Sequence, residues 1–180
     1  MTLPAYAGAH AKLDPCRANL RADWRGHMTQ QIPDPDPDTV KAFDADPKAF
    51  NANVVEEFRA NGGKVGGPFA NVELLLLTTT GAKTGQPRVS PLGYLRNDSE
   101  LIIFGSYRGA DVHPAWVHNL RANPRAHIEL GTQSFGVTAR ELPPGERDAV
   151  WGKLLALGPV FGEYQAKTSR VIPLFELNRL

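Results

Sequence analysis

Cysteine is nearly absent from this 180-residue chain, in which Cys16 is the single example. One cysteine cannot form a disulfide within the chain, and it cannot build a cysteine-based zinc site or an iron–sulfur cluster. This usage fits a reducing cytoplasm. We therefore expect a cytoplasmic protein whose fold is stabilised without crosslinks.

Long apolar runs are missing as well. No stretch of 18 apolar residues occurs, so we expect no membrane-spanning helix. The N-terminus lacks the apolar segment of a secretory signal. A hydrophobic content of 42% and a charged content of 22% are those of a soluble globular protein, here one domain with a substantial core plus appendages.

The chain also lacks a large net charge. Its 20 basic and 19 acidic side chains give +1, which argues against nucleic-acid binding driven by bulk charge. The charge is unevenly placed, however. Residues 33–60 carry seven acids and three bases, whereas residues 83–125 carry six bases and three acids. We therefore expect an acidic ligand to bind the middle of the chain.

No catalytic triad or metal-ligand constellation is visible. His113 and His118 have no nearby carboxylate at a ligand-like spacing, which favours hydrogen-bonding or surface roles. Ser90 and Ser106 lack the nucleophile-elbow pattern. These absences argue against a metalloenzyme and against a hydrolase.

What the chain does contain is a succession of strand-like segments joined by turns. Strands are expected at residues 72–80, 88–96, 101–107, 126–130, 134–141 and 172–177. Helices are expected from Asp46 to Gly62, from Pro114 to Leu120, from Pro143 to Leu155, and from Phe161 to Lys167. Tight turns between successive strands disfavour a doubly wound parallel sheet. The pattern predicts a mainly β (α+β) fold, with a six-stranded antiparallel barrel-like sheet and flanking helices.

The first 45 residues are expected to be a flexible arm and an acidic, proline-rich linker, with the folded domain at 46–180. Leu13, Leu20 and Trp24, with three arginines between and beside them, form a weakly amphipathic basic stretch. Such a stretch is compatible with peripheral membrane contact by the arm.

The turn between the first two expected strands carries Gly81, Lys83, Thr84, Gly85 and Arg88. Glycines let a backbone approach a ligand, and the two cations supply charge-assisted hydrogen bonds. These features suit an anion site, although a solvated hairpin has the same local pattern.

A second notable segment is the Ser/Gly-rich stretch that follows the third expected strand. A helix starts after it at Pro114, and both the loop and the helix N-terminus can present backbone donors to a polar ring or a phosphate. Trp116 is positioned either to cover an aromatic cofactor or to pack, with Leu120, as the core face of a small helix.

Three motifs together resemble the deazaflavin-dependent nitroreductase family, the split β-barrel reductases of actinobacteria that use reduced coenzyme F-420, an 8-hydroxy-5-deazaflavin. They are Phe-Arg-Ala-Asn-Gly-Gly-Lys-Val-Gly-Gly at 58–67, Thr-Thr-Gly-x-Lys-Thr-Gly-Gln-Pro-Arg at 79–88, and His-Pro-x-Trp-x-x-Asn-Leu-x-Ala-Asn-Pro at 113–124. The resemblance covers the chain from about Phe50 onward. It implies a quinone-reductase-like oxidoreductase with an FMN-binding split-barrel-like fold, which transfers hydride from the coenzyme to a quinone-like, enone or nitro-aromatic acceptor.

The resemblance also implies residue roles. Lys83, Thr84 and Arg88 match positions that hold the phosphate and the acidic polyglutamyl tail, and Ser106 lies near the ring. The expected cofactor-binding residues are Ala82, Lys83, Thr84, Arg88, Val89, Ser90, Pro91, Leu92, Gly93, Phe104, Gly105, Ser106, Tyr107, Ala115, Trp116, Val117, His118 and Asn119. Hydride transfer needs positioning in a dry pocket more than acid–base groups, which is consistent with the missing catalytic constellation.

The catalytic residues expected by resemblance are Ser106, Tyr164 and Phe161. The chain departs from the family near its C-terminus, where Gly158 and Phe161 stand at positions at which tyrosines are expected. A roomier, more apolar pocket would suit a quinone or an activated enone better than a nitroimidazole.

Two alternatives remain open at this stage. The same barrel could bind FMN, with Lys83 and Arg88 holding a single phosphate, as pyridoxamine-oxidase-like barrels do. A carrier that stores the coenzyme or a lipid-like ligand would have no catalytic role, because hydride transfer leaves no signature acid or base.

Overall fold

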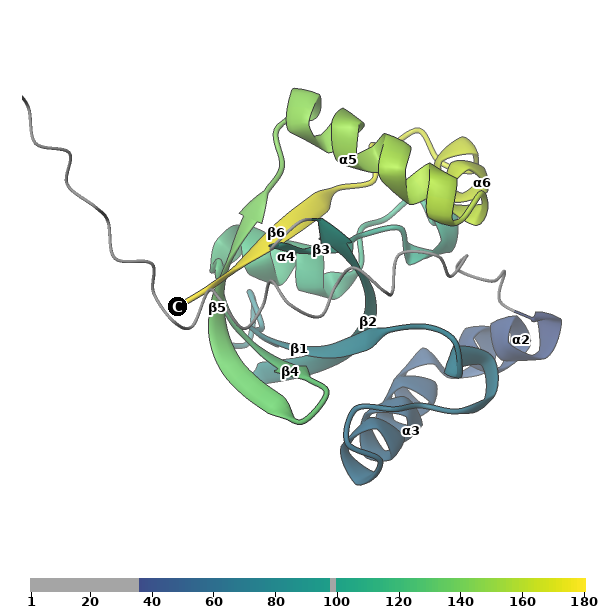
Figure 1. Ribbon diagram of the computed structural model, residues 1–180, viewed down its shortest axis with the longest axis vertical. Coiled ribbons are helices and arrows are strands. Elements are labelled where there is room, and N and C mark those ends of the chain that lie inside the picture. Colours follow the sequence, from purple (N-terminus) through teal and green to yellow (C-terminus); the bar gives the residue numbers. More distant parts are fainter. Residues whose placement is uncertain (1–35, 98–99) are drawn as a thin grey trace, which may run out of the picture.

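The computed structural model describes residues 36–97 and 100–180 (Figure 1). The expectations about residues 1–35, including membrane contact through the arm, lie outside the described residues. Within the described ranges, no helix combines the length and the apolar character needed to cross a membrane.

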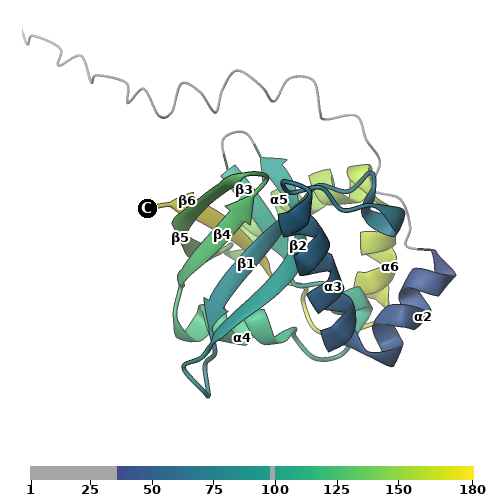
Figure 2. The same ribbon diagram turned by 90° about the horizontal axis from the view of Figure 1, so that it is seen from below.

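The strands of the described chain form a closed antiparallel barrel, which confirms the predicted fold class. In chain order they are β1 (Leu74–Thr80), β2 (Pro87–Asn97), β3 (Glu100–Phe104), β4 (Arg125–Leu130), β5 (Gln133–Glu141) and β6 (Leu174–Arg179). Their order around the barrel is β1-β2-β3-β6-β5-β4, and β4 pairs with β1 to close it. Figure 2 shows the strands wrapping around a common interior.

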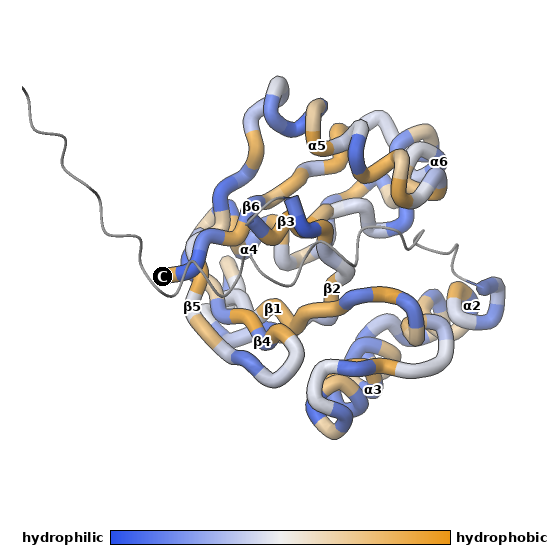
Figure 3. The backbone as a smooth tube through the Cα atoms, in the orientation of Figure 1, coloured by the Kyte–Doolittle hydropathy of each residue, from blue (hydrophilic) through white to orange (hydrophobic). Residues whose placement is uncertain are grey.

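The four leucines of β1 explain why this strand reads as a continuous apolar run. Side chains alternate between the two faces of a strand. Leu75 and Leu77 belong to the barrel core, together with Ile103 and Phe175. Leu74 and Leu76 belong to an outer cluster packed under a helix. Both faces of β1 are therefore buried, and Figure 3 shows the hydrophobic colour along it.

That helix is α3 (Pro47–Ala60), which buries Val54 and Phe58 against the outside of β1. Its N-cap, Asp46, accepts hydrogen bonds from the backbone N–H groups of Lys48 (3.0 Å) and Ala49 (2.9 Å). The chain leaves α3 through Gly62 and Gly63, whose φ angles of 61° and 94° favour glycine. This helix matches the expected one closely.

The remaining helices surround the barrel. They are α2 (Pro37–Ala45), α4 (Ala115–Ala122), α5 (Pro144–Leu157) and α6 (Val160–Ala166), with short 3-10 turns η2 (Gly67–Phe69) and η3 (Tyr107–Gly109). Helices α5 and α6 form a separate apolar cluster with β3 and β6, which includes Leu154, Phe161, Ile172 and Leu174. Figure 1 shows α6 and the α2–α3 pair on the same side of the barrel, with β2 between them.

Two expectations about element boundaries were wrong. Ordered structure was expected to begin near Asp46, but α2 already starts at Pro37. The Asp36 carboxylate caps this helix by accepting hydrogen bonds from the backbone N–H groups of Asp38 (3.0 Å) and Thr39 (3.0 Å). The same residues that stiffen a linker thus begin a helix, because aspartate before proline is a strong helix start. The third strand was expected to reach Tyr107 but ends at Phe104, and Tyr107 instead begins η3 with a φ of 43°.

An ion pair between Arg59 of α3 and Glu129 of β4 should make the attachment of this helix depend on pH. The Arg59 Nη2 to Glu129 Oε1 distance is 2.6 Å, and hydrogen bonding by Arg59 lowers the pKa of Glu129. The folded-state pKa is therefore below the unfolded value, so the stabilisation is present at neutral pH and is lost as the pH falls through the folded pKa. We expect Glu129→Gln to lower Tm by about 1–3 °C at pH 7, since partly exposed pairs contribute little, and by progressively less as the pH is lowered.

Thermal unfolding of the two proteins from pH 7 to pH 3 measures this difference. Glu56→Gln is the control, because Glu56 is an exposed carboxylate on the same helix. A Tm difference for Glu129→Gln that stays constant down to pH 3 would contradict the prediction.

Candidate functional site

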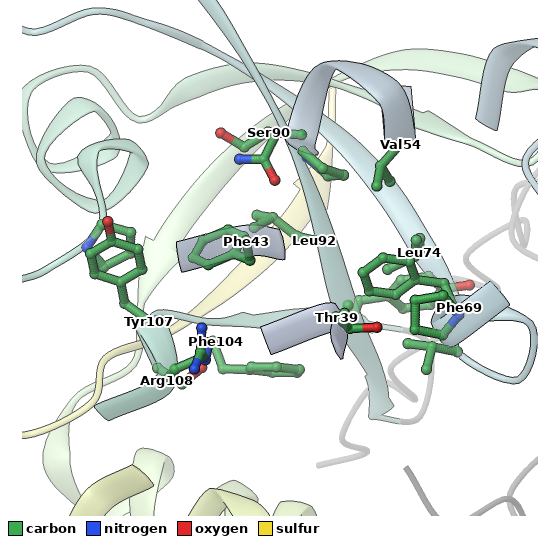
Figure 4. Close-up of a pocket in the computed structure, with 18 of the residues that line it drawn as sticks. Thr39, Phe43, Val54, Phe69, Leu74, Ser90, Leu92, Phe104, Tyr107 and Arg108 are labelled. Carbon is green, nitrogen blue, oxygen red and sulfur yellow. The ribbon is translucent and has the colours of Figure 1, made fainter. Parts of the chain in front are cut away.

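A cavity of about 540 Å³ lies beside β2, between the α2–α3 pair and α6. Its walls come from many parts of the chain: α2, α3, the segment around η2, the start of β1, β2, the end of β3, the β3–α4 loop, the start of α4, the end of α5, and α6. Figure 4 shows Phe43 of α2, Leu92 of β2, Phe104 of β3 and Tyr107 of the β3–α4 loop around one space.

The cavity wall is rich in aromatic rings. On the α6 side, the Phe104 and Phe161 ring centroids are 4.8 Å apart, and Phe161 and Tyr164 follow at 6.1 Å. On the α2–α3 side, Phe43 packs edge-on against Phe50 at 5.7 Å and against Tyr107 at 6.4 Å. Rings on both sides suit a planar ligand and keep water away from it.

About half of the residues expected to hold the cofactor line this cavity. The three predicted catalytic residues line it too: Ser106 from the β3–α4 loop, and Phe161 and Tyr164 from α6. The lining residues among those expected are Ser90, Pro91, Leu92, Gly93, Phe104, Ser106, Tyr107, Ala115, Trp116, Phe161 and Tyr164. They come from β2, the end of β3, the β3–α4 loop, the start of α4, and α6. The structure therefore places in one space residues that lie as far apart in sequence as Ser90 and Tyr164.

The other expected residues do not line the cavity. They are Ala82, Lys83, Thr84, Arg88, Val89, Gly105, Val117, His118 and Asn119. Val117 is fully buried in the barrel core, and a Cβ at Gly105 would lie 2.9 Å from Pro173 Cγ and 3.0 Å from Val117 Cγ2. Gly105 and Val117 therefore pack closely where the β3–α4 loop begins, and do not contact the cavity.

The predicted anion-binding turn connects β1 and β2. Gly81 N–H donates to the Gln86 carbonyl (2.8 Å), Gly85 N–H donates to the Gly81 carbonyl (2.8 Å), and Gly85 has a φ of 66°. Lys83 and Arg88 are exposed, and neither forms an ion pair with any residue that the structure describes. Arg88 precedes Ser90 by two positions in β2, so the two side chains leave the same face of the strand.

Asn119 fixes this turn to α4. Its Oδ1 accepts from Ala82 N–H (2.9 Å) and its Nδ2 donates to Thr79 Oγ1 (3.0 Å). Asn119 and Thr79 are both buried, at 6% and 2% exposure. The amide of Asn119 is therefore engaged by the protein at both ends, a role that the sequence pattern did not indicate.

Sequence reasoning also missed the helix that covers one side of the cavity. Thr39, Val40 and Phe43 of α2 line it, and Arg108 joins α2 to the β3–α4 loop. Arg108 Nη1 lies 2.6 Å from Asp44 Oδ1, and the guanidinium lies 5.7 Å from the centre of the Phe43 ring. The sequence showed that residues 33–60 are acidic, but it did not show that Asp44 pairs with Arg108.

Two ionisable groups near the site have shifted pKa values. Burial raises the pKa of Tyr94, which lines the cavity, to about 12, so its phenol stays protonated at neutral pH. Arg96 Nη2 donates to Tyr94 Oη (3.0 Å). Burial lowers the pKa of His113, with the charge of Arg121 as the next cause. Across 36–97 and 100–180, no group of histidine, cysteine or carboxylate side chains is arranged to bind a metal ion.

Comparisons with known proteins point to one family. The family described as F420H(2)-dependent quinone reductase matches residues 51–178. The F420H(2)-dependent quinone reductase Rv1261c of Mycobacterium tuberculosis is 38% identical over 128 residues, which cover 68% of this chain and 85% of that protein.

Solved structures agree. An F420-H2 dependent reductase, FDR-A, is 37% identical with a TM-score of 0.53, over 58% of this chain and 93% of that one. A structure described as a domain-swapped dimer is 31% identical with a TM-score of 0.55, over 73% of this chain and 99% of that one.

Proposed function

Because the chain belongs to the F420H(2)-dependent quinone reductase family, we propose that it holds reduced coenzyme F-420 beside β2 and reduces a quinone in the same cavity. The chain is an oxidoreductase of this class, and coenzyme F-420 is its cofactor. The observation that supports this location most is that Ser90, Ser106, Trp116 and Phe161 line one cavity.

The site suits both the ring system of the coenzyme and its acidic tail. A planar apolar ring system suits the space between the aromatic walls, which Trp116 also lines although it is only 5% exposed. A phosphate and a carboxylate-rich tail suit Lys83 and Arg88, which are exposed cations at the turn. Since Arg88 and Ser90 share a face of β2, one ligand can run from the cavity to the turn.

When bound, reduced coenzyme F-420 supplies a hydride, because carbon replaces the redox nitrogen of a flavin. The protein's task is to position the acceptor and to exclude water. Phe43, Phe104 and Phe161 bring apolar rings to the cavity, where they would keep water away from a bound coenzyme. Ser106 and Tyr164 bring hydroxyl groups to the same cavity, and we assign to them the polarisation of the acceptor carbonyl.

The acceptor that this cavity favours is planar and apolar. Leu157 at the end of α5 and Val160 and Phe161 of α6 give one side of the cavity an apolar wall. Among the described lining residues, the charged side chains are Glu73, Arg96 and Arg108. Arg108 is bound to Asp44 and Arg96 lies 3.6 Å from Glu73. We therefore propose a quinone as the acceptor, with activated enones as the next class and nitro-aromatic compounds third.

Titration of the purified protein with coenzyme F-420 and with FMN, followed by fluorescence quenching, tests the cofactor. We expect tighter binding of coenzyme F-420, because a single phosphate leaves part of the basic turn unused. Addition of menadione to the protein with reduced coenzyme should then restore the fluorescence of the oxidised deazaflavin. Tighter FMN binding would overturn the cofactor site, and tight coenzyme binding without oxidation by menadione would indicate a carrier.

A further inference from the structure

Arg170, in the loop between α6 and β6, makes an unusual set of contacts with one segment of the chain. Its Nε donates to the Ala110 carbonyl (2.7 Å), its Nη1 to the Gly105 carbonyl (3.0 Å) and its Nη2 to the Ser106 carbonyl (2.7 Å). Nη1 also lies 3.1 Å from Nδ1 of His113. All four partners belong to the β3–α4 loop, residues 105–114.

This loop has a backbone that needs external support. Tyr107 and Arg108 have φ angles of 43° and 54°, in the left-handed region that is strained for a residue other than glycine. Its own hydrogen bonds are Gly109 N–H to Ser106 O (2.9 Å) and Ala110 N–H to Tyr107 O (3.0 Å). The carbonyls that Arg170 binds lie on both sides of these strained residues.

The opposite side of the loop faces the cavity. Ser106, Tyr107 and Arg108 line it, whereas Arg170 does not. The loop is also fitted closely to α6, since a Cβ at Gly109 would lie 2.6 Å from the Tyr164 carbonyl oxygen. Contacts with Arg170 and with α6, on the side away from the cavity, thus fix the position and the backbone conformation of the loop.

We propose that Arg170 is a positioning residue, which holds the β3–α4 loop in the strained conformation that presents Ser106, Tyr107 and Arg108 to the cavity. The inference rests on the proposed function only for the identity of the ligand. Arg170 acts through the loop and touches no reacting atom.

The geometry requires a guanidinium. A planar fork can donate in three directions at once to carbonyls at fixed positions, whereas a lysine ammonium is a single point charge. The Arg170 side chain is itself held by its backbone, since its N–H donates to Thr168 Oγ1 (3.3 Å) and its carbonyl accepts from Gln165 Nε2 (2.7 Å). His113 can accept from Arg170 only as a neutral ring with its proton on Nε2.

The test compares Arg170→Lys with Arg140→Lys in the full chain. Arg140 is a matched control, because its guanidinium is also multiply bonded and lies outside the cavity lining, but its partners are Glu146 and Glu176 and not the β3–α4 loop. We expect Arg170→Lys to weaken binding of coenzyme F-420 by about tenfold and to raise its KM more than it lowers kcat. Arg140→Lys should leave both within twofold.

Amide hydrogen exchange without any ligand gives a second readout. Exchange at Gly109 and Ala110 should accelerate about tenfold in Arg170→Lys, while exchange in β1 stays unchanged, because only the loop is released. Millimolar guanidinium chloride added to Arg170→Ala should restore part of the coenzyme affinity.

The outcomes separate the two proposals. A parent protein that does not bind coenzyme F-420 contradicts the proposed function, whereas faster loop exchange in Arg170→Lys would still support the positioning role. A parent that binds the coenzyme and an Arg170→Lys variant with parental affinity and exchange would overturn the inference. A variant that fails to fold while Arg140→Lys folds would also overturn it, because Arg170 would then be needed for the whole fold.

Discussion

Replacing Lys83 and Arg88 together by alanine is expected to weaken binding of coenzyme F-420 by roughly 100-fold. Charge-assisted hydrogen bonds to phosphate or carboxylate contribute about 1.5–3 kcal/mol each, and exposure of both side chains places them at the lower end of that range. Since about 1.4 kcal/mol corresponds to tenfold in affinity, two such contacts account for the expected loss. Fluorescence titration with the polyglutamylated coenzyme measures it.

Two controls make this result specific. The deazaflavin chromophore without phosphate or tail should bind the parent and the double variant equally, because it does not reach the turn. Replacing Lys64 and Lys153 by alanine removes the same total charge from residues that do not line the cavity, and should change coenzyme affinity by less than threefold. A double variant at 83 and 88 that keeps its parental affinity would remove the turn from the site.

The second large effect is expected from Asn119→Leu, a substitution of similar volume. It leaves the buried Thr79 hydroxyl without its partner and frees the Ala82 N–H from the turn. An unsatisfied buried polar group and two lost hydrogen bonds should lower the free energy of unfolding by about 3 kcal/mol. Chemical denaturation measures the loss, and coenzyme titration should show weaker binding because Lys83 follows Ala82 directly.

Thr79→Val supplies the partner for a double-mutant cycle. Once Asn119 has been replaced, removal of the Thr79 hydroxyl no longer breaks a hydrogen bond, so the double variant should be destabilised by less than the sum of the single variants. We expect a coupling of about 1 kcal/mol. Strict additivity would show that the two side chains do not support each other.

The strands of the barrel could be predicted from the sequence because each is marked by residues that are close together in the chain. Strand-like segments separated by tight turns predicted each strand of the described chain, and the four-leucine run lies in the strand that is covered on both faces. The closing pairs, β1 with β4 and β3 with β6, join residues far apart in the chain. No local pattern specifies such pairs, so closure was supplied by resemblance.

The site was only partly accessible, for the same physical reason. Residues in recognisable motifs, such as Ser106 and Trp116, could be assigned by resemblance, and they do line the cavity. Phe43 lies before those motifs, in a stretch whose prolines and aspartates indicated a linker. The Asp36 cap and Pro37 start a helix there, and its contact with the cavity loop is made by Arg108, more than sixty residues away.

Roles that depend on geometry were the least visible. Asn119 belongs to a family motif, but its pattern does not distinguish a ligand contact from a buried brace. Arg170 stands alone in the sequence, and only the fold brings its guanidinium to three carbonyls of one loop. An isolated arginine has no sequence signal that separates this role from solvation.

The placement of β6 has a consequence for folding during translation. This strand pairs with both β3 and β5, and it is the last of the six in chain order. A nascent chain that has not reached Leu174 therefore carries two strands with unpaired edges, which are templates for aggregation. A ribosome stalled before β6 would therefore hold a chain in which the β3 and β5 edges have no partner strand.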